Sequence, residues 1–325
     1  MPANLSPEYL DAEERFKQAR ATPEKISALE EMLATIPKHK GTEKMQAELK
    51  RKLSKLRGEK KKGGARHTPV YQIERQGAGQ VTLVGPPNSG KSSLLARLTR
   101  AAPRVADYPF ATRLPLPGMM PFENIQIQLV DLPPLHPDSP ESWVPQALRY
   151  ADAVALVVDL GQDDVLEQLT ETLAQLEKGK IRLGRETAEL PRGFVRKLAL
   201  LVGNKCDLPR ARTNFEILAE LWKERFRLLA VSAQTGEGLE SFRRAVFDLL
   251  GIVRIYTKSR GKKVDRSTPF VLPRGATVRE VAERVHKDFV GTLKFARIWG
   301  AGKFDGQMVQ RDYIVEDNDV IELHA

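Results

Sequence analysis

Residues 85–92, with the sequence GPPNSGKS, constrain this chain more than any other feature, because they match the pattern G-x-x-x-x-G-K-S. They directly follow the apolar run Val81–Val84 and open an amphipathic segment at residues 93–98. Glycines in such a loop let backbone N–H groups form a phosphate-sized nest at a helix N-terminus. We therefore predict a strand, a phosphate-binding loop and a helix. The residues expected to line the phosphate site are Gly85, Asn88, Ser89, Gly90, Lys91, Ser92 and Ser93.

Four side chains are expected to carry the chemistry of phosphoryl transfer. Lys91 would act as a catalytic residue by contacting the β- and γ-phosphates, and the Ser92 hydroxyl would bind Mg²⁺. Asp131 ends the apolar run Ile125–Val130 and is the expected second Mg²⁺ group, acting through water. Thr112 lies between these residues in the sequence, and we predict that it is a catalytic switch residue that closes on Mg²⁺ in the triphosphate state.

The phosphate loop belongs to a region in which apolar runs alternate with amphipathic segments. The runs are short, rich in β-branched residues and apolar on both faces: Val81–Val84, Ile125–Val130, Ala153–Val158, Leu198–Val202 and Leu228–Val231. Such runs are typical of a parallel sheet that is covered by helices on both sides. The pattern predicts an α/β fold with a doubly wound, mostly parallel sheet.

The tetrapeptide NKCD at residues 204–207 favours guanine over adenine. A carboxylate at Asp207 can accept hydrogen bonds from the N1–H and 2-amino groups of guanine, whereas adenine has no matching donors. Asn204 would connect the base to the phosphate loop, and the Lys205 stem would cover one face of the base. Ser232 and Ala233 follow a later run, and we expect the Ala233 N–H to donate to guanine O6. GTP and GDP are therefore the expected ligands, and an ATP-dependent kinase or transporter subunit is disfavoured.

The net charge of +10 is confined to the two ends of the chain. Residues 1–68 hold 16 basic and 10 acidic residues, residues 69–251 hold 22 of each, and residues 252–325 hold 14 and 10. We interpret these ranges as a helical N-terminal extension with a basic linker, a nucleotide-binding domain and a small C-terminal domain. In the last range Thr277 and Glu280 form a capping box, which predicts one helix crossing a small mixed sheet.

Basic residues concentrate in two segments of these flanks, Lys38–Arg66 and Lys258–Arg266. The first segment has 12 basic and three acidic residues. Such clusters favour contact with RNA or the ribosome, and the alternative is a solvated surface. The N-terminal helices would also suit a stabilising protein partner. The single cysteine, Cys206, fits a reducing cytosol, and the sequence shows neither a secretory signal nor an apolar run long enough for a membrane span, so we expect a cytoplasmic protein without membrane contact.

Taken together, these motifs resemble a known family. The set GPPNSGKS, YPFAT, DLPP, NKCD and SAQTGEG is similar to the Obg-like GTPases. The C-terminal stretches Ile255–Lys258, Leu272–Val278, Val285–Asp288 and Ala296–Gly300 resemble the TGS domain of developmentally regulated GTP-binding proteins. The resemblance covers about residues 40–325. It implies GTP hydrolysis, contact with ribosomes or RNA, and a β-grasp, ubiquitin-like fold for the last domain.

The chain departs from the family pattern at one motif. Family members have D-x-x-G where this chain has Asp131-Leu132-Pro133-Pro134, and proline has no N–H to donate to a γ-phosphate. Leu135 stands where related enzymes place a water-positioning glutamine, so we expect slow hydrolysis. The alternative is a nucleotide-binding RNA or ribosome adaptor with negligible hydrolysis. Asn88 resembles an asparagine that holds K⁺ in some related GTPases, and a loop-shaping role is equally open.

Overall fold

The structure is a computed structural model that describes residues 7–18, 22–36, 42, 45–53, 73–99, 114–135, 143–185, 189–258, 263–286, 289–301 and 303–324. The chain divides into two compact units, Met1–Pro69 and Val70–Ala325. In the part of the chain so described, none of the helices is long and apolar enough to cross a lipid bilayer.

The N-terminal unit is helical, as predicted. It contains α1 (Pro7–Gln18), α2 (Thr22–Thr35) and a further helical stretch at residues 45–53. In α2 the side chains of Leu29 and Met32 are buried and pack with Leu49. The predicted basic contact segment, residues 38–66, falls largely outside the described residues.

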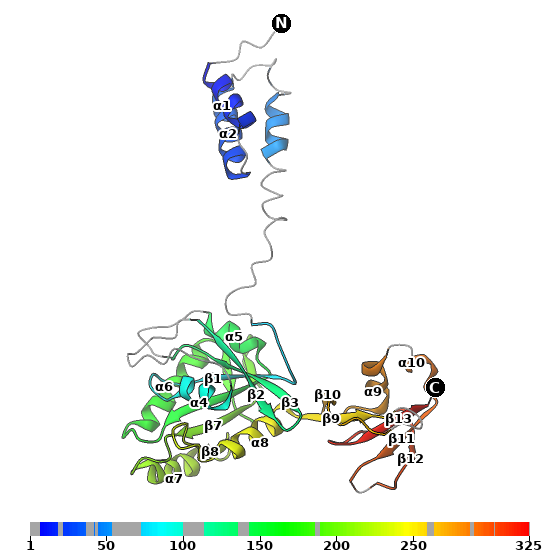
Figure 1. The fold of residues 1–325 in the computed structure, drawn as a ribbon. Coiled ribbons are helices and arrows are strands. Elements are labelled where there is room, and N and C mark those ends of the chain that lie inside the picture. Colours follow the sequence, from blue (N-terminus) through cyan, green and yellow to red (C-terminus); the bar gives the residue numbers. More distant parts are fainter. Residues whose placement is uncertain are drawn as a thin grey trace. The chain divides into compact units, whose positions relative to one another are not determined.

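The second unit contains a six-stranded sheet with the order β2-β3-β1-β4-β7-β8 (Figure 1). Its strands are β1 (Gln80–Val84), β2 (Leu116–Phe122), β3 (Ile125–Asp131), β4 (Ala153–Asp159), β7 (Ala199–Asn204) and β8 (Arg227–Ala230). All neighbours pair in parallel except β2, which is antiparallel to β3 at the edge. The five predicted apolar runs form β1, β3, β4, β7 and β8, which confirms the predicted sheet.

Helices cover both faces of this sheet. They are α4 (Lys91–Leu98), α5 (Val144–Tyr150), α6 (Val165–Lys178), α7 (Ala211–Trp222) and α8 (Leu239–Leu250). One apolar cluster joins one face of the sheet to α4 and α8, and a second joins the other face to α5, α6 and α7. The architecture is therefore the doubly wound three-layer α/β arrangement that the sequence predicted.

Three strands of this region were not predicted. β2 contains Pro117 and Pro121, which argue against an interior strand but are tolerated at a sheet edge. The strands β5 (Ile181–Leu183) and β6 (Val195–Lys197) form a separate parallel pair of three residues each. Strands this short leave no readable alternation of apolar residues.

The C-terminal part forms a second sheet, with the order β10-β9-β13-β11-β12. Its elements are β9 (Ile252–Thr257), β10 (Phe270–Pro273), α9 (Val278–Val285), α10 (Phe289–Thr292), β11 (Phe295–Trp299), β12 (Gln307–Val309) and β13 (Val320–His324). The predicted capping box of Thr277 and Glu280 begins α9, whose Val281 and Ala282 pack on this sheet. A mixed sheet crossed by one helix is the β-grasp arrangement. The short β12 and α10 were not predicted.

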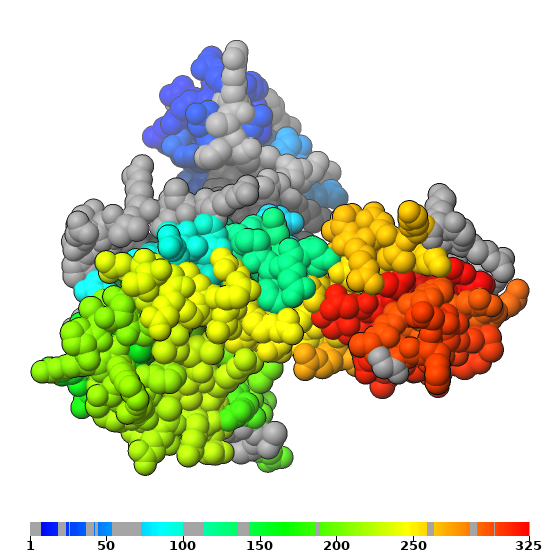
Figure 2. All heavy atoms as spheres, turned by 60° about the horizontal axis from the view of Figure 1, so that its bottom comes forward, coloured from blue at the N-terminus to red at the C-terminus, as the bar shows by residue number. Residues whose placement is uncertain are grey.

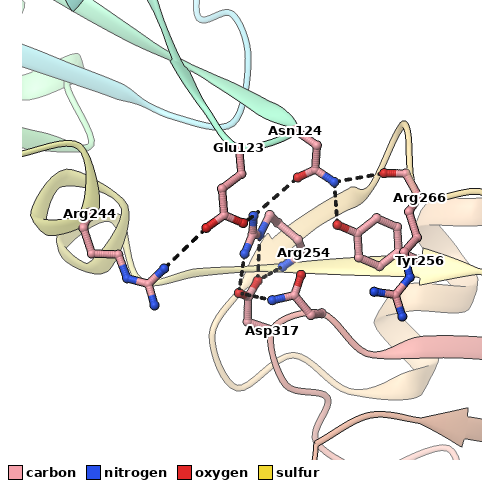
Figure 3. A network of polar contacts seen from close by, with 8 residues as sticks. Glu123, Asn124, Arg244, Arg254, Tyr256, Arg266 and Asp317 are labelled. Atoms are coloured by element: carbon pink, nitrogen blue, oxygen red, sulfur yellow. Dashed lines mark hydrogen bonds and ion pairs between the residues drawn. The ribbon is translucent and has the colours of Figure 1, made fainter. Parts of the chain in front are cut away.

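A polar network ties the β2–β3 turn to the C-terminal sheet (Figure 3). The Arg254 side chain is 1% exposed, and its Nη2 lies 2.7 Å from Asp317 Oδ2 while Nη1 contacts Glu123. Asn124 donates to the Tyr256 hydroxyl and to the backbone carbonyl of residue 266. In Figure 2 the green β2–β3 hairpin reaches the surface beside the yellow α8, against which it also packs through stacked aromatic rings. The hairpin is thus held from two sides.

Candidate functional site

The phosphate loop connects β1 to α4, as the motif predicted. Gly85 and Gly90 have φ angles of 152° and 84°, a region that side chains with a Cβ rarely adopt. A Cβ on Gly90 would lie 2.2 Å from Asn204 Nδ2, and one on Gly85 would lie 2.0 Å from the Val157 carbonyl oxygen. Both glycines are therefore required by backbone angle and by space.

Lys91 is buried inside the loop at the first residue of α4. Its Nζ donates to the carbonyl oxygens of Pro86 at 2.8 Å and Gly85 at 3.1 Å. Burial lowers the pKa of Lys91 to about 8, and the Asp131 charge opposes this shift. A phosphate group strongly stabilises a buried ammonium group, because its negative charge compensates for the hydration that the ammonium group has lost.

Ser92 and Asp131 meet at the carboxyl end of β3. The Ser92 hydroxyl donates to Asp131 Oδ2, and among the described residues the buried Asp131 Oδ1 has no hydrogen-bond partner. Burial raises the pKa of Asp131, while the Lys91 charge and the Ser92 hydrogen bond lower it. A hydroxyl and a carboxylate oxygen are ligands that suit Mg²⁺, and a buried carboxylate oxygen without a donor is consistent with a cation or its water at this place. The residues present therefore fit the predicted metal.

Asn204 connects the two halves of the predicted nucleotide site. Its side chain is buried at the end of β7, where Nδ2 donates to the Ser89 carbonyl at 2.9 Å. On the other side the Ala233 N–H donates to Asn204 Oδ1 at 3.1 Å. We expected that N–H to serve guanine O6, and here Asn204 engages it. One amide thus joins the phosphate loop to the loop that follows β8.

The remaining base-side residues lie around Asn204. Lys205 has a φ of 62°, and its Nζ pairs with Asp159 Oδ2 at 2.6 Å. Asp207 is exposed, so its carboxylate is accessible to a ligand. The Ser232 hydroxyl is buried and accepts the Thr235 N–H at 3.0 Å, which shapes the loop after β8.

Asp159 is a site residue that the sequence reasoning missed. It is 1% exposed at the end of β4 and also accepts the Gly161 N–H at 2.9 Å. Through its ion pair it fixes the Lys205 stem, which was predicted to cover the base. The signal was available, because Asp159 ends an apolar run in the same way as Asp131 does.

Some predicted residues are not brought into this cluster of contacts. Thr112 lies outside the described residues. Asn88 is exposed with a φ of 59°, a conformation that asparagine tolerates better than most residues. Ser93 is exposed on α4.

The segment after β3 lies against the phosphate loop. The Leu135 N–H donates to the Gly85 carbonyl at 3.2 Å, and the Leu135 side chain packs on the core cluster of α5, α6 and α7. Pro134 is half-buried beside it. The DLPP turn is therefore anchored by Leu135 on one side and by β3 on the other.

Comparison with known proteins identifies both parts of this unit. Residues 80–186 match the family described as 50S ribosome-binding GTPase, and residues 253–325 match the TGS domain. Among solved structures, a variant of NFeoB from S. thermophilus bound to GDP.AlF4- is 23% identical, with a TM-score of 0.40 over 53% of this chain and 63% of that chain.

Relatives extend over nearly the whole chain. An uncharacterized GTP-binding protein of Methanocaldococcus jannaschii is 30% identical over 360 residues, which covers 92% of this chain and 92% of that protein. Developmentally-regulated GTP-binding protein 2 of Mus musculus is 26% identical over 362 residues, with 92% of this chain and 98% of that protein covered. Both alignments are longer than this chain of 325 residues, so these relatives carry segments that have no counterpart here. With its phosphate loop, its TGS domain and relatives of this extent, the chain belongs to the developmentally regulated GTP-binding proteins of the Obg-like GTPase superfamily.

Proposed function

We propose that this protein binds GTP and GDP between the phosphate loop and Asp207, hydrolyses GTP slowly to GDP and phosphate, and acts on ribosomes or RNA. The observation that carries the proposal is the buried Asn204 amide, which contacts the Ser89 carbonyl at 2.9 Å and the Ala233 N–H at 3.1 Å. This amide couples a site for phosphate to a loop at the place expected for the base.

The proposed reaction is attack of water on the γ-phosphate without a covalent intermediate. Lys91 donates hydrogen bonds to the β- and γ-phosphate oxygens and so stabilises the charge of the transition state. Ser92 and, through water, Asp131 would hold Mg²⁺, which supplies positive charge to the phosphate oxygens. Thr112 is the proposed third group on the metal side.

Slow turnover follows from the residues after Asp131. Leu135 has no polar side-chain atom with which to orient water, and its N–H already donates to Gly85. Pro134 has no N–H for the γ-phosphate. These two residues favour a second candidate function, an RNA or ribosome adaptor that binds nucleotide with negligible hydrolysis.

The proposed partners follow from the charged flanks and from the family. The matching family is described as ribosome-binding, which supports contact through the segments Lys38–Arg66 and Lys258–Arg266. We also propose the domain limits 1–68, 69–251 and 252–325, a cytoplasmic location, and a protein partner for the N-terminal helices. For Asn88, the positive φ supports the loop-shaping role, and K⁺ binding is the alternative that the experiment below tests.

Calorimetry with GDP, GTP and ATP tests the ligand, since the proposal requires heat with the guanine nucleotides and none with ATP. Single-turnover hydrolysis with and without ribosomes then separates the two functions. A GTPase gives measurable phosphate release that ribosomes accelerate, whereas an adaptor gives ribosome binding without release. Equal rates in potassium and sodium buffers would remove the proposed K⁺ role of Asn88.

A further inference from the structure

The parallel pair of β5 and β6 presents basic side chains on its outward face. Arg182 lies directly opposite Arg196 in the register of the pair, while Ile181 and Leu183 on the other face are buried in the core. The Arg182 guanidinium lies 5.8 Å from the centroid of the Phe194 ring, which places both on the same face. Because side chains alternate along a strand, the outward set is defined by every second residue. We call this set the β5–β6 ribbon: Lys180, Arg182, Phe194, Arg196 and Leu198.

The segment that contains the ribbon has a large surplus of positive charge. Residues 178–198 contain seven basic and two acidic residues, although residues 69–251 as a whole are neutral. Glu177 adds one carboxylate, which lies 3.3 Å from Arg182 Nε. Even with every carboxylate paired, the basic residues remain in excess.

More positive charge lies next to the ribbon. Arg149 Nη2 donates to the Gly193 carbonyl at 3.3 Å, and Lys197 Nζ donates to the Arg149 carbonyl at 2.8 Å. The pKa of Lys197 is lowered, first by burial and also by the charges of Arg75 and Arg149, although Asp152 opposes this shift. The cations at this edge are close enough to repel one another.

The ribbon is partly accessible and lies at the opposite end of β7 from the nucleotide site. Its Lys180 is exposed, as are the neighbouring Lys178 and Arg192, and its Leu198 is 46% exposed. Arg182 and Arg196 are half-buried. Lys197 precedes the amino end of β7, whereas Asn204 lies at its carboxyl end. Six residues of strand separate the two places by about 20 Å. A ligand on the ribbon would therefore leave the GTP site open.

We propose that the β5–β6 ribbon binds the phosphate backbone of RNA. Guanidinium groups suit phosphate oxygens, and the exposed Lys180 adds a further cation beside them. A membrane surface is less suitable, because the ribbon offers little exposed apolar area to insert. The choice of RNA over an acidic protein rests on the ribosome or RNA contact proposed above, and the experiment separates the two proposals.

The test compares the full chain with the double variant Arg182→Gln/Arg196→Gln. Binding to a short fluorescent RNA duplex is measured by anisotropy between about 50 and 200 mM KCl. We expect the variant to bind about tenfold more weakly at low salt and the slope of log K against log[KCl] to fall by about two. The matched control is Arg210→Gln/Arg212→Gln, which removes two exposed cations from the start of α7 and is expected to change affinity much less.

A second readout needs no substitution near the ribbon. RNA should protect Lys178 and Lys180 of the natural chain from acetylation, while Lys294, just before β11 in the C-terminal sheet, serves as the exposed reference. Full reactivity of Lys178 and Lys180 in the RNA complex, or equal affinities and slopes for the two double variants, overturns the inference and leaves the proposed ribosome or RNA contact standing. A natural chain that binds GDP but no RNA overturns both. Ribbon-dependent binding of polyglutamate without RNA binding would assign the surface to an acidic protein instead.

Discussion

Replacing Asn204 by alanine tests the connection between the phosphate loop and the base side. The change removes two hydrogen bonds of 2.9 and 3.1 Å from a side chain that is 1% exposed. Each such bond contributes about 0.5–1.5 kcal/mol, and a buried partner left without a bond costs about 1–3 kcal/mol. We therefore expect a total loss of about 2–4 kcal/mol. Because the nucleotide must then order the loop itself, GDP affinity should fall about thirtyfold or more in calorimetry.

The matched control is Asn214→Ala on α7. The Asn214 amide donates to the carbonyls of Leu160 at 2.8 Å and Gln162 at 2.9 Å, so the change removes two similar bonds outside the phosphate loop. We expect it to lower the free energy of unfolding while GDP affinity stays within about threefold. Equal losses of affinity in the two variants, or an unchanged affinity in Asn204→Ala, would refute the coupling role of Asn204.

Three further predictions address the lysine, the DLPP turn and the polar network. The pKa of Lys91 without nucleotide is about 8, and a bound phosphate favours the charged form of this lysine. GDP affinity should therefore fall as the pH rises above about 8, because binding then requires uptake of a proton. Calorimetry in buffers of different ionisation enthalpy measures this uptake. Pro134→Gly supplies a backbone N–H donor for the γ-phosphate and should raise the ratio of GTP to GDP affinity about tenfold. An unchanged ratio would show that this turn does not contact the γ-phosphate. Asp317→Asn leaves the buried Arg254 poorly paired and should cost about 3 kcal/mol in urea unfolding at neutral pH, compared with a small effect for the exposed Asp312→Asn. Burial raises the pKa of Asp317, but the Arg254 hydrogen bonds outweigh this effect and lower that pKa. The stabilisation by Asp317 is therefore complete above the ordinary carboxyl pKa and is lost as the pH falls through the lower pKa of the folded state. At that low pH the free energies of unfolding of the two variants should converge.

The central sheet could be predicted because its strands are buried on both faces. The apolar runs at β1, β3, β4, β7 and β8 record that burial directly. The edge strand β2 could not be found in this way, since its exposed edge admits Pro117 and Pro121. Strand β5 is stabilised by contacts with α6 and the core, and β6 by its pairing with β5, rather than by their own sequence pattern.

The site was predictable in its residue types and less so in its contacts. The motif placed Gly90, Lys91 and Asn204 together, because only a few residue types satisfy the loop's backbone angles and the buried polar groups. The pairing of Asn204 with the Ala233 N–H could not be foreseen, since it depends on how two separate loops meet. The charge count along the sequence also gave no sign of the basic β5–β6 ribbon, because residues 69–251 are neutral in total.

The strand β3 has a different attachment at each end. Asp131 at its carboxyl end contacts Ser92, and Asn124 just before its amino end is bonded to Tyr256 of the C-terminal sheet. β3 is hydrogen-bonded to β1 on one side and to β2 on the other, which restrains bending along its length. The Ser92–Asp131 contact and the C-terminal sheet are therefore attached to the two ends of one strand that is paired on both sides.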